Sequence, residues 1–148
     1  MNDAEYIKKA LELANKAAEM GEIPVGALVV KDGEIIGEGY NLRESQGSAI
    51  SHAEVIAIEE ACRRLGSWRL SGATLYVTLE PCPMCTGAII NSRIDRVVFG
   101  AKDSAAGCCG SVVNLSAYPF NHAFKIEGGV CAEECLAVIR EFFEKRRK

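Results

Sequence analysis

A chain of 148 residues, 49% of them hydrophobic, can bury a substantial core and is shorter than chains that usually split, so we expect one domain over residues 1–148. No apolar run approaches the ~18–20 residues that cross a bilayer, nothing at the N-terminus resembles a secretory signal, and we therefore expect no membrane partner. The net charge is −3, whereas a typical nucleic-acid-binding protein is basic. The number of cysteines is odd, seven, which favours a cytoplasmic location over a secreted, disulfide-bonded one.

The spacing of apolar residues predicts helices that alternate with strands. An amphipathic helix is expected over 1–20, beginning near Asp3 and ending at Gly21. Asp32 and Gly33 then suit a type I′ turn between two strands. The expected elements after the first helix are strands 25–30 and 35–40, helix 52–65 with Ser51 as its N-cap, strand 73–79, helix 82–92, strand 95–101, a loop without periodicity over 102–122, a short strand and a final helix. This order predicts an α/β fold, a three-layer α/β/α sandwich around a mixed sheet of about five strands.

Three residues that commonly bind zinc lie in two short motifs. His52 begins His-Ala-Glu, and Cys82 and Cys85 lie in Pro-Cys-Pro-Met-Cys. Each motif opens a predicted helix, so the two cysteines share one helical face, and the positive end of the helix dipole favours their thiolates. Structural zinc sites normally have four protein ligands, whereas this set has three and leaves one position for water. The sequence therefore predicts a catalytic site for one Zn²⁺.

Glu54 lies two residues after the predicted histidine ligand and is not needed as a ligand. Zinc lowers the pKa of bound water from about 15.7 to roughly 7, and a nearby carboxylate can carry protons from that water to a ring nitrogen and to a departing amine. H-x-E combined with P-C-x-x-C is the signature of zinc nucleobase deaminases. The motifs therefore predict a hydrolytic deamination with Glu54 as the proton shuttle.

Each motif alone has a more ordinary interpretation. An isolated His52 would usually be a partly buried histidine, and Ser51-x-x-Glu54 is also a capping box in which the carboxylate returns to the backbone. A lone Cys-x-x-Cys can be a redox pair or half of a structural zinc site. The occurrence of both motifs, with a strand before the second, favours the catalytic interpretation.

The remaining cysteines and the basic C-terminus allow two interpretations each. Cys108 and Cys109 lie in a glycine-rich loop and are either small packing residues, which we favour, or oxidation-sensitive thiols. Cys131 and Cys135 have the spacing of a metal-binding pair, but no further ligand follows them, so a packing role is favoured. The four C-terminal residues, 145–148, are all basic. They either attract a phosphate backbone or complement the end of the last helix.

Segments beyond the metal motifs resemble bacterial tRNA-specific adenosine deaminases, a family with a cytidine deaminase-like fold. These segments are 22–27, 39–41, 74–82, 92–94, 97–103, 121–122 and 142–143, and the resemblance covers nearly the whole chain. It implies a zinc-dependent conversion of adenosine to inosine at wobble position 34 of an arginine tRNA. Zinc-bound hydroxide would attack C6 while Glu54 moves the protons.

The resemblance also implies a role for each matching residue. Asn41 would bind the base, since its amide offers both a donor and an acceptor. The other expected roles are His52, Cys82 and Cys85 as zinc ligands, Ile23, Val25 and the Ala53 backbone as the pocket lining, Lys102, Asp103, Asn121 and His122 on the flanking nucleotides, and Phe142, Phe143, Arg146 and Arg147 in stacking and phosphate contacts. The expected partner is a tRNA anticodon stem-loop, whose bases are already unpaired, and the expected assembly is a homodimer whose RNA groove uses both subunits.

Two other functions are compatible with the same metal motifs. A deaminase of a free base or nucleoside, such as guanine or cytosine, would share the metal core, but the basic, aromatic C-terminus favours RNA. The second alternative function is that of a non-catalytic RNA-binding module stabilised by zinc. The intact Glu54 and the missing fourth protein ligand argue against it.

Overall fold

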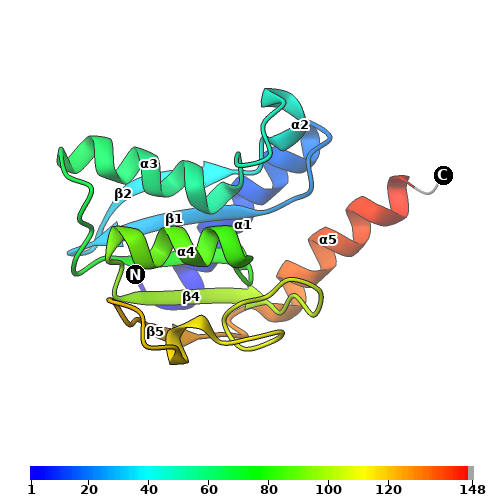
Figure 1. Ribbon diagram of the computed structural model, residues 1–148. Coiled ribbons are helices and arrows are strands. Elements are labelled where there is room, and N and C mark those ends of the chain that lie inside the picture. The colour runs from blue at the N-terminus through cyan, green and yellow to red at the C-terminus, as the bar shows by residue number, and fades with distance from the viewer. Residues whose placement is uncertain (147–148) are drawn as a thin grey trace.

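Five strands form one mixed sheet in the order β2-β1-β3-β4-β5 (Figure 1). The computed structural model describes residues 1–146, with strands β1 (Gly26–Lys31), β2 (Glu34–Tyr40), β3 (Thr74–Leu79), β4 (Arg96–Ala101) and β5 (Lys125–Glu127). β1 pairs with β2 and β3 in antiparallel fashion, whereas β4 is parallel to both β3 and β5. Because β3 and β4 are parallel, the segments that follow them emerge at the same edge of the sheet.

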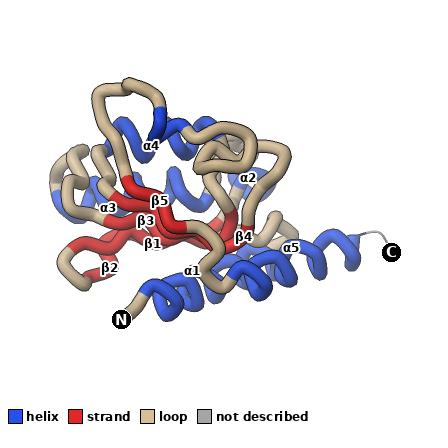
Figure 2. The backbone as a smooth tube through the Cα atoms, turned by 90° about the horizontal axis from the view of Figure 1, so that it is seen from below, coloured by secondary structure: helices blue, strands red, loops and turns tan. Residues whose placement is uncertain are grey.

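Helices cover both faces of this sheet, which confirms the predicted three-layer sandwich. The helices are α1 (Asp3–Glu19), the single turn α2 (Arg43–Gln46), α3 (Ala53–Leu65), α4 (Pro83–Ser92) and α5 (Ala132–Arg146). Figure 2 shows α3 and α4 above the sheet and α1 and α5 below it, and α5 extends beyond the body of the protein. A buried apolar cluster fills each of the two interfaces. No helix within residues 1–146 is both long enough and apolar enough to span a bilayer.

The hairpin and the position of α3 depend on local backbone properties. Asp32 and Gly33 both have positive φ, 52° and 74°, as the predicted type I′ turn requires. Gly39 on β2 faces the carbonyl oxygen of Ala53 so closely that a Cβ there would overlap it, and Gly37 meets Ala57 in the same way. The two glycines therefore let α3 lie directly on β2, and this contact sets the height of its N-terminus above the sheet.

The predicted N-cap of α3 is wrong by one residue. His52 occupies the cap position and makes no side-chain capping bond, while the hydroxyl of Ser51 donates to Gln46 Oε1 at 2.6 Å. The capping box that competed for Glu54 is therefore not formed. A true capping box occurs at α1 instead, where Asn2 and Glu5 bond each other's backbone N–H groups.

The predicted loop over 102–122 is confirmed as irregular. It contains one turn of 3₁₀ helix, Leu115–Ala117, and one isolated bridge between Cys109 and Asn114. Long loops of this kind in a small domain usually serve function. Its first half lies beside the carboxyl ends of β3 and β4, where the metal motifs converge.

Candidate active site

His52, Cys82 and Cys85 converge at the N-termini of two helices. His52 is the N-cap of α3, Cys82 is the N-cap of α4, and Cys85 lies in the first turn of α4. His52 Nδ1 is 3.6 Å from Cys82 Sγ and 3.5 Å from Cys85 Sγ, and the three candidate ligand atoms lie within 4.8 Å of one another. The sequence prediction that these three residues form one cluster is therefore confirmed.

The spacing of the cluster fits a tetrahedral zinc ion. Zn–S bonds of about 2.3 Å and a Zn–N bond of about 2.0–2.1 Å at tetrahedral angles separate the nitrogen and sulfur by about 3.6 Å. The observed separations, 3.5 and 3.6 Å, agree with this value. Hydrogen bonds from Cys85 and His52 lower the pKa of Cys82 to about 4, and the same contact between the two thiols raises the pKa of Cys85. The pair therefore favours a thiolate at Cys82. The donor set and its geometry therefore suit zinc with one open position.

Glu54 lies in the first turn of α3 and lines the same cavity as His52 and Cys82. It is only 4% exposed, and burial raises its pKa to about 7. A carboxyl with a pKa near the working pH exchanges protons readily in both directions, which is what a general acid/base requires. The geometry therefore lets Glu54 transfer protons beside the metal cluster.

A cavity of about 240 Å³ opens in front of this cluster. Its lining residues are Ile23, Val25, Asn41, Arg43, His52, Ala53, Glu54, Leu79, Glu80, Cys82, Asp103 and Ala106. Pockets for drug-sized ligands are typically about 300–1,000 Å³. This cavity is thus of a size for one ring system, and a larger substrate would have to remain mostly outside it.

Asn41, the predicted base-binding residue, lines the cavity and is itself held by two backbone contacts. Its Nδ2 donates to the carbonyl oxygen of Ile23 at 3.2 Å, and its Oδ1 accepts from the N–H of Arg43 at 3.1 Å. Only 7% of its surface is exposed. The amide group is therefore fixed in orientation, and its second N–H remains for a ligand.

Two buried carboxylates were missed by the sequence-based prediction: Glu80, which lines the cavity, and Glu22, which precedes the lining residue Ile23. Glu22, 1% exposed, accepts hydrogen bonds from the N–H groups of Glu44 and Ser45 and from the Ser45 hydroxyl, at 3.1, 2.6 and 2.6 Å. Glu80, 2% exposed, accepts from three N–H groups and one hydroxyl of the 103–111 segment. Burial alone would raise the pKa of each carboxyl, but these hydrogen bonds outweigh it and lower both pKa values.

The residues predicted to hold flanking nucleotides divide into two groups. Asp103 lines the cavity, although its Oδ1 accepts from the N–H groups of Ala105 and Ala106. Lys102 is exposed and borders a separate hollow on the other side of the same segment. The structure does not bring Asn121 and His122 to the cavity, since His122 Nε2 lies 2.7 Å from the carbonyl oxygen of Ile94, before the start of β4.

No residue of α5 (Ala132–Arg146) lines the cavity, so its aromatic and basic side chains lie outside it. Phe142 is 8% exposed and its ring lies 4.8 Å from the Arg146 guanidinium, so it packs rather than presenting a face to solvent. Phe143 is 40% exposed and is available for stacking. Arg146 donates to the carbonyl oxygen of Gly21, next to the segment that carries Glu22. Arg147 lies outside the described residues.

The other cysteines are free thiols with little exposure. Burial raises the pKa values of both Cys108 and Cys109, which supports packing rather than reactivity for this pair. Cys135 is 1% exposed and faces Gly100, and Cys131 is not part of any metal-like cluster in residues 1–146. Both cysteines of α5 are thus compatible with packing roles.

Comparison with known proteins agrees with this geometry. The MafB19-like deaminase family matches residues 1–147. A tRNA-specific adenosine deaminase of Bacillus subtilis is 52% identical over 147 residues, which cover 99% of this chain and 91% of that protein. The chain belongs to the tRNA-specific adenosine deaminase family. The family resemblance proposed from the sequence motifs is thereby confirmed.

Two solved structures show how far the resemblance to this family extends. One comes from a study of A-to-I editing by tRNA:A34 deaminases at the wobble position of transfer RNA, and it matches with a TM-score of 0.88 at 38% identity over 90% of this chain and 98% of that one. A guanine deaminase from Bacillus subtilis is 43% identical, but its TM-score is 0.66 and the match covers 69% of this chain and 66% of that one. The first match spans nearly the whole fold, whereas the second leaves about a third of each chain unmatched.

Proposed function

We propose that this protein is a zinc-dependent deaminase that converts adenosine to inosine at wobble position 34 of a tRNA anticodon, with an arginine tRNA as its substrate. The observation that carries the proposal is the open three-ligand cluster of His52, Cys82 and Cys85 with the buried Glu54 in the same cavity. The nearly full-length relationship to tRNA-specific adenosine deaminases supports the choice of substrate.

The cavity residues suit each part of the reaction. When bound by the three ligands, zinc would supply the Lewis acidity that lowers the pKa of water from about 15.7 to roughly 7. Glu54 would accept a proton from the attacking water and deliver it to N1 of adenine. It would then take a second proton from the new hydroxyl group on C6 and pass it to the amine, which leaves C6 as ammonia. Asn41 would hold the purine edge, and Ile23 and Val25 would contact the ring face.

The size of the cavity explains why an anticodon loop is a suitable substrate. A cavity of about 240 Å³ can admit one base but not its neighbours, so the target must leave the stack. A loop base is already unpaired and can be turned out at less cost than a base in a duplex. Arg43, exposed at the rim of the cavity, and Phe143 would then meet the RNA outside it.

The test is inosine formation, measured by mass spectrometry, in an arginine tRNA anticodon stem-loop with adenosine at the wobble position. Parallel reactions would contain a cytidine loop, a non-arginine loop with wobble adenosine, and free adenine, guanine and cytosine with their nucleosides. Inosine in the arginine loop alone is the expected result. Product from free guanine alone would favour the guanine deaminase alternative, which the partial match to that enzyme makes the second candidate.

Glu54→Gln tests the proton shuttle within the same assay. The amide keeps the size of the side chain but cannot carry the proton, so turnover should fall by about 10²–10⁴-fold while zinc stays at one ion per subunit. Glu59→Gln, an exposed position on the same helix, is the matched control and should remain active. An active Glu54→Gln enzyme would contradict the role of Glu54.

We further propose that the active enzyme is a homodimer. Asn121 and His122 lie away from the cavity of their own subunit, so their predicted contacts to nucleotides would be made with RNA bound at the other subunit. Mixing Glu54→Gln subunits with His122→Ala subunits tests this, because mixed dimers would contain one complete site. Activity above that of either variant alone is expected, and no recovery, with mixed dimers confirmed by mass spectrometry, would count against shared sites.

A further inference from the structure

The wall of the cavity formed by residues 103–111 folds around a single carboxylate, that of Glu80. Oε1 accepts from the N–H of Asp103 at 3.1 Å and from the Ser111 hydroxyl, and Oε2 accepts from the N–H groups of Cys109 and Ser111 at 3.0 and 3.1 Å. The first and last of these residues are eight positions apart in the chain. One buried side chain thus satisfies donors from both ends of the segment.

Gly107 shows independently how tightly the segment encloses this carboxylate. A Cβ at Gly107 would overlap the carboxyl carbon and both oxygens of Glu80. The backbone at Gly107 has no positive φ that would itself require glycine. The absence of a side chain there is therefore explained by the approach of the backbone to Glu80.

The segment held in this way carries two residues of the cavity wall, Asp103 and Ala106. Asp103 is fixed at its N–H by Glu80, and its own Oδ1 then accepts from the N–H groups of Ala105 and Ala106. The turn that forms this side of the cavity is therefore connected through hydrogen bonds to Glu80. No metal ligand lies on the segment, since the ligands are at the N-termini of α3 and α4.

The opposite wall is held by the same kind of contact. Glu22 accepts from the N–H groups of Glu44 and Ser45 and from the Ser45 hydroxyl, which fixes α2 and its first residue, Arg43, which lines the cavity. A buried carboxylate that accepts several backbone hydrogen bonds restricts its loop to one low-energy conformation. In any other conformation some of these bonds would be lost, and the buried charge would lack hydrogen-bond donors.

We infer that Glu80 is a positioning residue of the substrate pocket, whose carboxylate holds the 103–111 wall in place for the nucleotides beside the target base. This inference rests on the proposed RNA substrate for its kinetic consequence. Its structural content, the dependence of the wall on Glu80, does not require that substrate.

Glu80→Gln is the direct test, because glutamine has the same shape but presents one acceptor oxygen and an NH₂ group to N–H donors. Zinc should stay at one ion per subunit, and kcat per bound zinc should change by less than about threefold. The KM for the anticodon stem-loop should rise by about tenfold or more. Amide hydrogen exchange at Asp103, Cys109 and Ser111 should become faster. A merely structural role would instead lower the folded fraction and leave KM unchanged.

Gly107→Ala and Ser111→Ala provide the matched comparisons. Ser111→Ala removes one of the four donors and should raise KM less than Glu80→Gln does. In the wild-type protein, Gly107→Ala should strongly raise KM and speed amide exchange in the 103–111 segment. In a Glu80→Ala background, where the overlapping carboxylate is gone, the same change should add little to either effect. Additive effects of the two changes on KM and on amide exchange would overturn the inference.

The outcomes also separate this inference from the proposed function. If the wild-type protein makes no inosine from any loop, the proposed function fails, while amide exchange and zinc content still test the wall. Unchanged exchange and unchanged KM in Glu80→Gln would overturn the inference and leave the deaminase assignment intact.

Discussion

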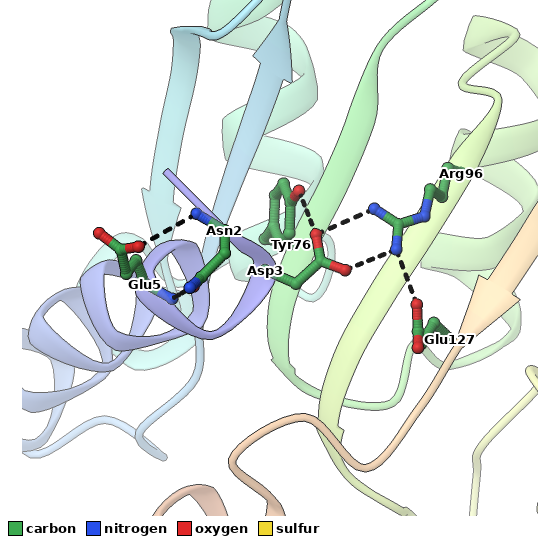
Figure 3. A network of polar contacts seen from close by, with 6 residues as sticks. All are labelled: Asn2, Asp3, Glu5, Tyr76, Arg96 and Glu127. Atoms are coloured by element: carbon green, nitrogen blue, oxygen red, sulfur yellow. Dashed lines mark hydrogen bonds and ion pairs between the residues drawn. The ribbon is translucent and has the colours of Figure 1, made fainter.

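The two ends of the central sheet are held by different kinds of polar contact. At the carboxyl ends of β3 and β4, the carboxylates of Glu22 and Glu80 are at most 2% exposed and accept hydrogen bonds mainly from loop backbone. At the start of β4, Arg96 joins Asp3 and Glu127 through ion pairs of 2.6 and 2.7 Å (Figure 3). Their side chains are between 30% and 57% exposed.

This difference indicates that the polar contacts at one end of the sheet position the cavity loops, whereas those at the other end contribute mainly to stability. Exposed ion pairs are typically worth about 0–1 kcal/mol, and the two ion pairs of Arg96 connect α1, β4 and β5, none of which carries a residue that lines the cavity. A buried carboxylate bonded to backbone amides instead determines where a loop lies. We therefore expect changes near the cavity to affect activity more than stability, and changes near Arg96 to do the reverse.

Cys85→Ala should show the largest effect at the cavity end. Removal of one of three ligands leaves too few protein donors for a stable zinc site, so we expect loss of stoichiometric zinc and no detectable inosine. Metal content by atomic emission and the stem-loop assay measure the two losses. Cys62→Ala, at a half-buried position on α3, is the matched control and should keep its zinc. Full zinc in Cys85→Ala would show that another residue is the ligand.

A pair of glycine substitutions along β2 gives a finer test of the same division. Gly39→Ala and Gly37→Ala both push a methyl group against the backbone of α3, at Ala53 and Ala57 respectively. Each should cost about 1–3 kcal/mol of stability through overpacking. Only Gly39→Ala displaces the turn between His52 and Glu54, so only it should also lower activity per folded, zinc-loaded molecule, by about tenfold or more.

Thermal unfolding and single-turnover kinetics measure the two effects separately. If both variants lost activity equally, α3 would be moving as a rigid body. The distinction between a catalytic end and a structural end of this helix would then be wrong.

The fold and the cluster of His52, Cys82 and Cys85 could be predicted because their causes are local. Asp32-Gly33 specifies its own turn, and His52, Cys82 and Cys85 each lie at a helix start, where periodicity and spacing are informative. Parallel strands followed by helices then bring such starts to one edge of the sheet. The family resemblance supplied what these patterns could not, namely the identity of the substrate.

The features that were missed depend on contacts between distant parts of the chain. Glu80 and its hydrogen-bond partners are 23 to 31 residues apart, and a single acidic residue before a proline gives no sign of them. His52, not Ser51, is the cap of α3, and the Ser51 hydroxyl bonds Gln46 of α2 instead of the helix that follows it. Asn121 and His122 lie at the end of a loop without periodicity, so their distance from the cavity could not be inferred.

Asp3→Asn should have the smallest effect, and the size of its effect on stability depends on pH. The hydrogen bond from Arg96 lowers the pKa of Asp3, with a further contribution from Tyr76. A carboxyl whose pKa is lower in the folded state stabilises the fold above its unfolded pKa of about 3.9, and this contribution disappears as the pH falls through the folded value. Asp3→Asn should therefore cost about 1 kcal/mol or less at pH 7 and almost nothing near pH 2.5.

Urea unfolding of the wild-type protein and Asp3→Asn at both pH values measures this difference. Glu127→Gln is the matched control, because its side chain is more exposed, 57% against 30% for Asp3, and it should cost less at pH 7. Inosine formation by both variants should equal that of the wild type once corrected for the folded fraction. A loss of activity in Asp3→Asn would mean that the Arg96 network influences the cavity across the length of β4, and the two ends would have to be treated as one coupled unit.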